Sequence, residues 1–328
     1  MIRPLQVNSQ ITLLRAVAML TCTEVHCVKE VVNSMTVVMV CSVLHLTKLF
    51  NAIILHSYMP DSFGFSIIVP LVKDRCGDIS KLANYRAMSL SPLLAKLFES
   101  CLSNKFSAFM HTSDLQVGFK KHSGCANAIY IVQQLVQYYT KRGSTVYMSA
   151  LDASKAFDRI NHKTLIDKLI SRNTPMCFIQ IVVNWYSKLG AAVRWNGVLS
   201  SFLMFIAYGG VLSPLLYNLY VDYLLCELKA SKLGCCIKDI YVGCVMYADD
   251  ILLLSASVIT LQSMLSICSE YGRKHDIIFN CKKSVCMAVR SKWKTAISPM
   301  LLNDVPIPWV KEYQVFRHCA SGRHQFAC

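Results

Sequence analysis

The chain has 328 residues and carries 34 Lys and Arg against 19 Asp and Glu, which gives a formal net charge of +15. This length predicts a large core divided between two subdomains, and this charge favours a polyanionic partner, either a nucleic acid or an anionic membrane surface. The 16 cysteines are scattered without any Cys-x-x-Cys pair. They argue against a disulfide scaffold and predict reduced thiols in an intracellular protein, in the nucleus or the cytoplasm.

Zinc-binding cysteines and a membrane span are both disfavoured. The tightest cysteine cluster, Cys235, Cys236 and Cys244, has no His at ligand spacing, so a zinc site is not expected. The best candidate for a membrane span, residues 31–46, is shorter than the roughly 20 residues that a spanning helix needs and contains polar side chains. A buried helix is the favoured interpretation, and we expect neither a secretory signal nor stable membrane association.

Residues 1–43 contain no usable motif, and regular patterns begin at residue 44. Apolar spacing predicts a helix over residues 44–55, followed by a break and then a strand over 65–72 that ends at Lys73. A loop at 84–86, a short strand at 88–90 and a helix from residue 93 to about residue 110 follow. Lys73 and Arg86 are compatible either with ordinary surface charges or with contacts to phosphates.

A basic segment at residues 118–124 is bounded by glycines. It is compatible with a solvated turn, which is the commoner case, or with a loop whose backbone amides contact a phosphate. A helix is predicted over residues 126–141, and a strand over 145–151 then ends at Asp152.

The segment Tyr247–Asp250 lies between two apolar segments and predicts a strand, a tight turn and a second strand. By itself, the pair Asp249 and Asp250 fits either a solvated turn or a metal site. Asp152 at a strand end adds a third acid, and three adjacent carboxylates repel each other unless cations neutralise them. Two magnesium ions would do this and would also support phosphoryl transfer.

A helix is predicted from Ser213, with Ser213 as the N-cap and Pro214 at the first helical position. Gly209 and Gly210 lie shortly before it and would let another group approach the backbone closely.

Several of these segments carry a family resemblance. Residues 151–162, 209–220 and 247–250 resemble three successive palm motifs of reverse transcriptases, and their order and spacing are similar to those of non-LTR (LINE-type) retrotransposons. Residues 68–74 and 84–90 resemble the finger segments of that family, and residues 118–120 resemble the segment that follows them. The similarity covers residues 44–289.

The resemblance implies an α+β fold with right-hand polymerase fingers and palm, in which helices pack on an antiparallel palm sheet. The fingers and palm would span residues 44–290, and residues 291–328 would be a truncated start of the thumb or an unrelated tail. The implied activity is that of an RNA-directed DNA polymerase, a nucleotidyltransferase whose partners are an RNA template, a DNA primer and dNTPs. Asp152, Asp249 and Asp250 match the acids that bind two Mg²⁺, or Mn²⁺, and Asp152 and Asp249 would bridge the ions.

Other implied roles concern the nucleotide. Phe157 matches the aromatic residue that lies under the sugar and excludes a 2′-hydroxyl, although a core Phe would have the same spacing. Lys73 and Arg86 match positions near the phosphates. Asn280 and the pair Lys282 and Lys283 resemble the next palm segment, in which either lysine could lie near the active site.

The sequence departs from the family in two places. The family has an Arg-Gln pair before the two glycines, whereas this chain has Ala207 and Tyr208. The family also continues from residues 311–313 into a helical thumb, whereas this sequence ends at residue 328, so we expect the thumb to be largely missing and the chain to be a truncated copy. The alternative to an active polymerase is therefore a catalytically inactive nucleic-acid-binding remnant of a retrotransposon polyprotein. A third hypothesis, a membrane-associated protein, is supported only by the hydropathy and by residues 31–46.

Overall fold

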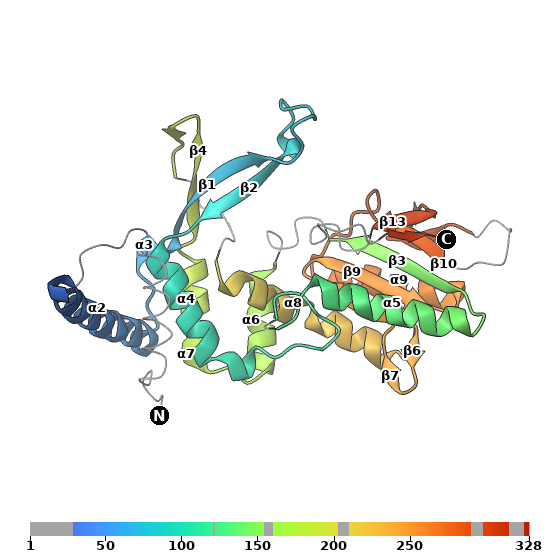
Figure 1. Cartoon of the computed structure of the whole chain (residues 1–328), viewed down its shortest axis with the longest axis horizontal. Helices are drawn as coiled ribbons and strands as arrows, with labels where there is room; N and C mark the ends of the chain where they lie inside the picture. Colours follow the sequence, from blue (N-terminus) through green and yellow to red (C-terminus); the bar gives the residue numbers. More distant parts are fainter. Residues whose placement is uncertain are drawn as a thin grey trace. The chain divides into compact units, whose positions relative to one another are not determined.

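The computed structural model describes residues 29–120, 122–153, 160–202, 210–289, 298–314 and 325–327. The chain divides into two compact units. Unit 1 is formed by Met1–Phe109 and Leu169–Leu212, and unit 2 by Met110–Lys168 and Ser213–Cys328. Each unit combines helices with its own sheet (Figure 1).

Unit 1 contains a group of helices around an aromatic core. Its helices are α2 (Lys29–His56), α3 (Asp61–Gly64), α4 (Leu93–Lys105) and α7 (Met176–Tyr186), with short 3-10 turns at Leu82–Asn84 and Ser107–Phe109. Phe98 of α4 lies with its ring centroid 5.0 Å from that of Phe50 and 6.2 Å from that of Trp185. The predicted helix over residues 44–55 is the second half of the longer helix α2. The contact between Phe50 and Phe98 packs this half against α4.

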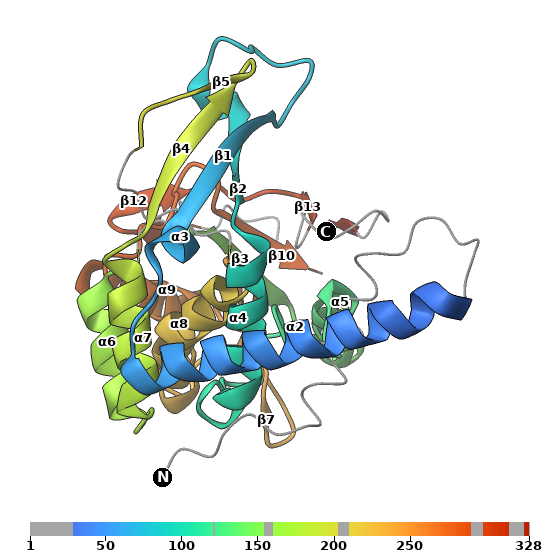
Figure 2. The ribbon, with the colours of Figure 1, turned by 90° about the vertical axis from the view of Figure 1, so that its left-hand side faces the viewer.

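The sheet of unit 1 has the strand order β2-β1-β4-β5. Its strands are β1 (Phe65–Val72), β2 (Tyr85–Leu90), β4 (Gly190–Trp195) and β5 (Val198–Leu199). β1 pairs antiparallel with β2 and parallel with β4, so this sheet is mixed. Figure 2 shows β4, β1 and β2 side by side, with α4 and α7 at one end of the sheet.

The sheet of unit 2 is antiparallel throughout and has the order β10-β3-β9-β8. Its strands are β3 (Val146–Asp152), β8 (Cys244–Tyr247), β9 (Asp250–Ser255) and β10 (Val285–Val289). Helix α5 (Cys125–Lys141) packs on one face, where Val132 and Leu135 meet Met148 and Leu254. Helix α9 (Val258–Lys274) contacts β9 and β3, and Leu151 and Leu253 on the other face are also buried. Apolar residues on both faces explain why β3 and β9 have continuous apolar sequences.

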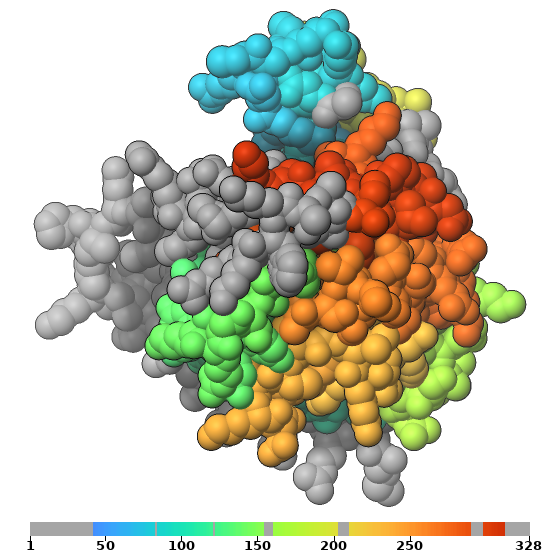
Figure 3. All heavy atoms as spheres, turned by 90° about the vertical axis from the view of Figure 1, so that its right-hand side faces the viewer, coloured from blue at the N-terminus to red at the C-terminus, as the bar shows by residue number. Residues whose placement is uncertain are grey.

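The remaining elements are two helices that the division into units cuts and three short hairpins. Helix α8 (Leu212–Ala230) continues from unit 1 into unit 2, and α6 (His162–Ser171) crosses the boundary between the units. Three two-stranded hairpins complete unit 2: β6 (Cys236–Ile237) with β7 (Ile240–Tyr241), β11 (Met300–Leu302) with β12 (Val305–Ile307), and β13 (Glu312–Gln314) with β14 (Gln325–Ala327). In the space-filling view, α5 in green and the β11–β12 hairpin in red-orange form part of the outer surface of this unit (Figure 3).

The architecture is therefore a mixed α/β fold with one antiparallel and one mixed sheet, and the predicted antiparallel sheet is present. Among the helices of the described residues, none combines the length and the apolar character that a membrane crossing requires.

Candidate active site

Asp152 is the last residue of β3, and the register of the sheet places it directly opposite Asp250, the first residue of β9. Cross-strand partners point to the same face of a sheet, so the two acids share a face. The backbone of Asp152 is held on both sides, because its N–H donates to Ser284 Oγ (3.2 Å) and its carbonyl accepts from Asn280 N–H (2.8 Å). The carboxylate itself is 31 % exposed, so it is accessible from a rigid position.

Asp249 lies in the two-residue turn that connects β8 to β9. Tyr247 and Asp250 are the closing pair of the hairpin, and Ala248 has a φ of 57°. Asp249, the second central residue, is not among the described residues with a positive φ. A positive φ at the first central residue alone is the type II′ pattern, which normally has Gly at that position. The side chain of Gln116 supports this turn by donating from Nε2 to the carbonyl of Ala248 (3.2 Å).

The structure shows how the backbones of the three predicted acids lie relative to one another. Asp152 and Asp250 are cross-strand partners, and Asp249 precedes Asp250 in the turn. Within the described ranges, no three His, Cys, Asp or Glu side chains gather closely enough to hold a metal ion. Three carboxylates are nevertheless the hard oxygen donors that Mg²⁺ prefers, so the donor set fits the predicted ion and metal binding stays a prediction.

Tyr217 of α8 is a neighbour of the acids that the sequence analysis did not single out. Its side chain is buried, and burial together with the negative charges of Asp249 and Asp250 holds the pKa of its hydroxyl well above the usual value. The phenol therefore stays protonated beside the two carboxylates. Nothing in the sequence distinguishes it from the other tyrosines of α8, because its role depends on which strand the helix covers.

Lys283 is the lysine that approaches the acids. Its Nζ lies 3.7 Å from Oδ2 of Asp152, and its side chain is 67 % exposed. The preceding turn is organised by Asn280, whose carbonyl accepts from the N–H groups of Lys283 (3.0 Å) and Ser284 (2.9 Å). The sequence left Lys282 and Lys283 as equal candidates, and the geometry places Lys283 at the acids.

Two residues of the basic segment at residues 118–124, Gly118 and Lys120, make contacts within the protein. The ammonium of Lys120 donates to the carbonyls of Thr112 (3.0 Å) and Ser113 (2.7 Å), and burial lowers its pKa. Gly118 packs against the backbone of the acid turn so closely that a Cβ would overlap the amide nitrogen of Ala248. Lys120 is thus bonded within the protein, and Gly118 is required by the turn that carries Asp249.

In unit 1, Lys73 and Arg86 lie at the same end of the β1–β2 hairpin. Arg86 is opposite Leu71, and the N–H of Lys73 donates to the carbonyl of Asn84 (2.8 Å), which extends the pairing by one residue. Residues two apart on a strand share a face, so this register places Lys73 and Arg86 on one face of the hairpin. Both residues are exposed.

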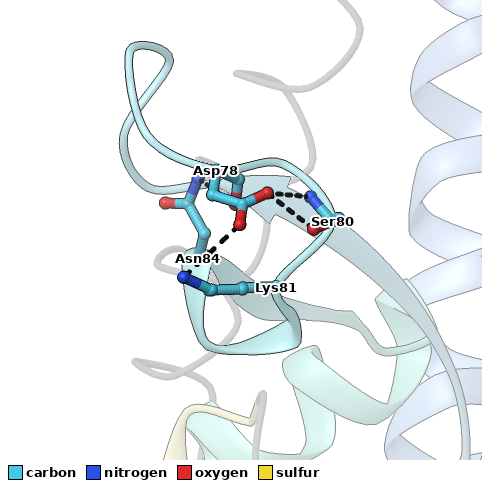
Figure 4. Close-up of polar contacts among 4 residues, drawn as sticks. All are labelled: Asp78, Ser80, Lys81 and Asn84. Atoms are coloured by element: carbon cyan, nitrogen blue, oxygen red, sulfur yellow. Dashed lines mark hydrogen bonds and ion pairs between the residues drawn. The ribbon is translucent and has the colours of Figure 1, made fainter.

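The loop between these two cations is held by its own polar side chains (Figure 4). Asp78 accepts from the N–H (2.9 Å) and the hydroxyl (2.6 Å) of Ser80 and lies 3.4 Å from the ammonium of Lys81. Asn84 donates from Nδ2 to the carbonyls of Asp74 (2.9 Å) and Asp78 (3.3 Å). The hydrogen bonds from Ser80 lower the pKa of the Asp78 carboxyl.

Gly210 lies against the carboxylate of Glu99, a buried residue of α4 that the sequence analysis missed. Glu99 accepts from the N–H of Leu212 (2.7 Å) at the start of α8, while burial raises its pKa. Helix α8 begins one residue before Ser213, so Ser213 is not the N-cap, and the carboxylate of Glu99 takes that role. A Cβ at Gly210 would overlap the carboxylate oxygens of Glu99, which accounts for this glycine by packing inside unit 1.

Three sequence features lie outside the described residues: Phe157, Gly209 and the pair Ala207 and Tyr208. The cysteine cluster is described, and burial raises the pKa of both Cys235 and Cys244 to about 12. Those thiols therefore remain protonated at neutral pH in this structure.

Comparisons with known proteins identify the family. The model of the reverse transcriptase (RNA-dependent DNA polymerase) family matches residues 73–313. The Pol polyprotein of the type-2 retrotransposable element R2DM of Drosophila melanogaster is 26 % identical over 214 residues, which are 64 % of this chain and 20 % of that protein. A probable RNA-directed DNA polymerase from the transposon X-element of the same organism is 27 % identical over 285 residues, which are 81 % of this chain and 30 % of that protein.

Two solved structures have a similar fold. Telomerase from Candida tropicalis, in complex with a fragment of telomeric RNA, gives a TM-score of 0.51 at 11 % identity, with 74 % of this chain and 43 % of that chain covered. The apo telomerase truncated from its C-terminal domain, from the same organism, gives a TM-score of 0.50 at 14 % identity. The match covers 74 % of this chain and 52 % of that chain. At these identities the structures share the fold alone.

The chain spans between 20 % and 30 % of the length of the two curated relatives described above. The predicted resemblance to non-LTR retrotransposons is confirmed, because those relatives are proteins of retrotransposable elements and the family model covers most of the chain. From residue 73 to residue 313, this chain belongs to the reverse transcriptase (RNA-dependent DNA polymerase) family.

Proposed function

We propose that this chain is an RNA-directed DNA polymerase domain that adds deoxynucleotides to the 3′ end of a primer on an RNA template. The observation that carries this proposal is the direct cross-strand pairing of Asp152 with Asp250, with Asp249 in the adjoining turn, in a member of the reverse transcriptase family. Unit 2, whose antiparallel sheet carries the acids, would be the palm, and the mixed sheet of unit 1 would belong to the fingers.

Asp152, Asp249 and Asp250 would hold two divalent cations, Mg²⁺ or Mn²⁺. When bound, such ions stabilise the attacking and leaving oxygens of an in-line phosphoryl transfer. The protein's part would be to hold three oxygen donors close together, and the pairing of Asp152 with Asp250 and the position of Asp249 next to Asp250 support this. Lys283, whose ammonium lies beside Asp152, would offset negative charge near the leaving pyrophosphate better than Lys282.

The remaining groups would bind the nucleotide and the template. Lys73 and Arg86, on one face of an exposed hairpin, would contact phosphates through long cationic side chains. Phe157 would lie under the sugar and reject a 2′-hydroxyl by its bulk. Gly209 and Gly210 would place the start of α8 near the template or the nucleotide.

A second candidate function is a catalytically inactive nucleic-acid-binding domain. It is favoured by Ala207 and Tyr208, which replace the Arg-Gln pair of the resembling family with a methyl group and a phenol. The net charge of +15 would be retained in such a domain and would still attract RNA. The metal-binding acids do not distinguish the two functions, because they are present in either case.

Primer extension on an RNA template with Mg²⁺ tests the proposal. We expect incorporation of dNTPs by the parent chain and a loss of at least about a hundredfold in Asp249→Asn, because the substitution removes one charged oxygen donor while keeping the size of the side chain. Asp239→Asn is the matched control, since it makes the same chemical change in the exposed turn between β6 and β7.

Equal incorporation by the parent and Asp249→Asn would contradict the assignment of the acids. No incorporation by the parent, together with RNA binding that weakens steeply as the salt concentration rises, would favour the second function. In that case, replacing Ala207 with Arg and Tyr208 with Gln tests whether the lost pair is limiting.

A further inference from the structure

The turn that carries Asp249 has a backbone conformation that its own sequence does not favour. Ala248 has a φ of 57°, a left-handed conformation in which the Cβ of an L-residue approaches the following carbonyl. A type II′ turn normally has Gly at this position. Something outside the turn must therefore stabilise it.

Gln116 has the geometry for this task. Its side chain is buried, with 0 % exposure, and both ends of its amide are used. Nε2 donates to the carbonyl of Ala248 (3.2 Å), and Oε1 accepts from the N–H of Gly118 (2.9 Å). The amide can satisfy a carbonyl and an N–H simultaneously in only one orientation, so its direction is fixed.

The segment that carries Gln116 is itself anchored to the hairpin. The N–H of Val117 donates to the carbonyl of Met246, and the N–H of Met246 donates to the carbonyl of Leu115, both at 2.8 Å. Helix α8 adds a further anchor, because Asn218 donates from Nδ2 to the carbonyl of Gly118 (3.0 Å). Gln116 therefore approaches the turn from a backbone that cannot easily move away.

We infer that Gln116 is a positioning residue that fixes the peptide between Ala248 and Asp249 and thereby the direction of the Asp249 carboxylate. This inference rests on the proposed function, in which Asp249 binds the catalytic ions. The carbonyl that Gln116 holds belongs to that same peptide. Rotating the peptide by half a turn would convert the type II′ turn to type I′, break the bond from Gln116 and require a positive φ at Asp249. Gln116 thus selects one of two turn types.

The test compares Gln116→Glu with a matched control. Glu has nearly the same shape and keeps the acceptor for Gly118, but it places an oxygen against the carbonyl of Ala248. Gln262→Glu makes the same change in α9, where Gln262 forms a similar pair of bonds with the backbone of Leu301 (2.9 and 2.8 Å). Both variants lose one bond to a backbone carbonyl, and only Gln116 touches the acid turn.

We expect Gln116→Glu to lower kcat for primer extension and the affinity for Mn²⁺ by roughly 10- to 100-fold, with KM for dNTP changed less. Mn²⁺ binding is measured by electron paramagnetic resonance on the folded protein without nucleic acid. Gln262→Glu should leave both values near those of the parent. Equal Mn²⁺ affinities in Gln116→Glu and Gln262→Glu would overturn the inference, and Gln116→Asn, whose shorter amide cannot span both contacts, replaces Gln116→Glu if the latter does not fold.

Ala248→Gly provides a second readout that is independent of activity. Gly adopts the left-handed conformation without strain, so the turn depends less on Gln116 in Ala248→Gly. The loss in the free energy of unfolding caused by Gln116→Glu, measured with urea, should therefore be smaller in the Ala248→Gly background than in the parent. If the parent neither extends a primer nor binds Mn²⁺, the proposed function fails, while this coupling still supports the positioning of the turn. Strictly additive effects of the two changes would overturn it.

Discussion

Unit 1 and unit 2 hold their predicted charged residues in opposite ways. In unit 2, Asp152 and Asp250 belong to the two central strands of an antiparallel sheet, and Asp249 lies in a turn that Gln116 supports. In unit 1, Lys73 and Arg86 lie at the exposed end of a hairpin whose loop is held by its own side chains. Metal ligation requires donors at fixed positions, whereas a long cationic side chain needs only to reach a phosphate. The difference in support therefore follows the difference in predicted chemistry.

The largest expected effect is on the support of the acid turn. In Gly118→Ala, the new methyl group would overlap the backbone nitrogen of Ala248, and neither of the two backbone segments can move without breaking its hydrogen bonds. We expect a loss of about 3 kcal/mol in the free energy of unfolding, measured with urea. Gly124→Ala is the control, because a Cβ at that position meets nothing within 4 Å, and it should cost less than about 1 kcal/mol. Equal losses would mean that the acid turn is not tightly supported.

A glycine in unit 1 provides a smaller effect. In Gly210→Ala, the methyl group would meet the end of the Glu99 side chain, which can adjust, instead of the backbone. We expect a loss of about 1.5 kcal/mol in the free energy of unfolding. Glu99→Asp in the same chain shortens the acid by one methylene group and should recover part of that loss. If Glu99→Asp makes the loss larger, Gly210 is not required by Glu99, and the approach of a template or nucleotide becomes the better explanation.

The smallest effect is expected in the loop of unit 1. The hydrogen bonds from Ser80 lower the pKa of Asp78 in the folded protein, so the folded state binds this proton less readily than the unfolded state. The resulting stabilisation is present above about pH 4 and is lost as the pH falls through the lowered pKa. In Ser80→Ala, the NMR titration of the Asp78 carboxyl should move towards higher pH, with little change in the midpoint of unfolding. An unchanged titration would show that Ser80 does not hold this loop.

Much of the fold could be read from local sequence patterns. The strand over residues 65–72 occurs as predicted, and the predicted helix over 126–141 is α5 with one additional residue. Periodic burial explains this success, because it depends only on neighbours in the same element. The same applies to the hairpin around Asp249, whose apolar strands and polar turn are visible in the sequence.

The sequence alone determined the family and the order of the elements, and it predicted the three acids. The tertiary structure decided which residues hold those acids, because Gln116 and Ala248 are 132 residues apart and Asp152 and Ser284 are also 132 residues apart. It also placed the ammonium of Lys283 beside Asp152 and replaced Ser213 with Glu99 as the cap of α8. A buried amide or carboxylate has no periodic pattern, and its function depends on which backbone groups the folded chain places within hydrogen-bonding distance.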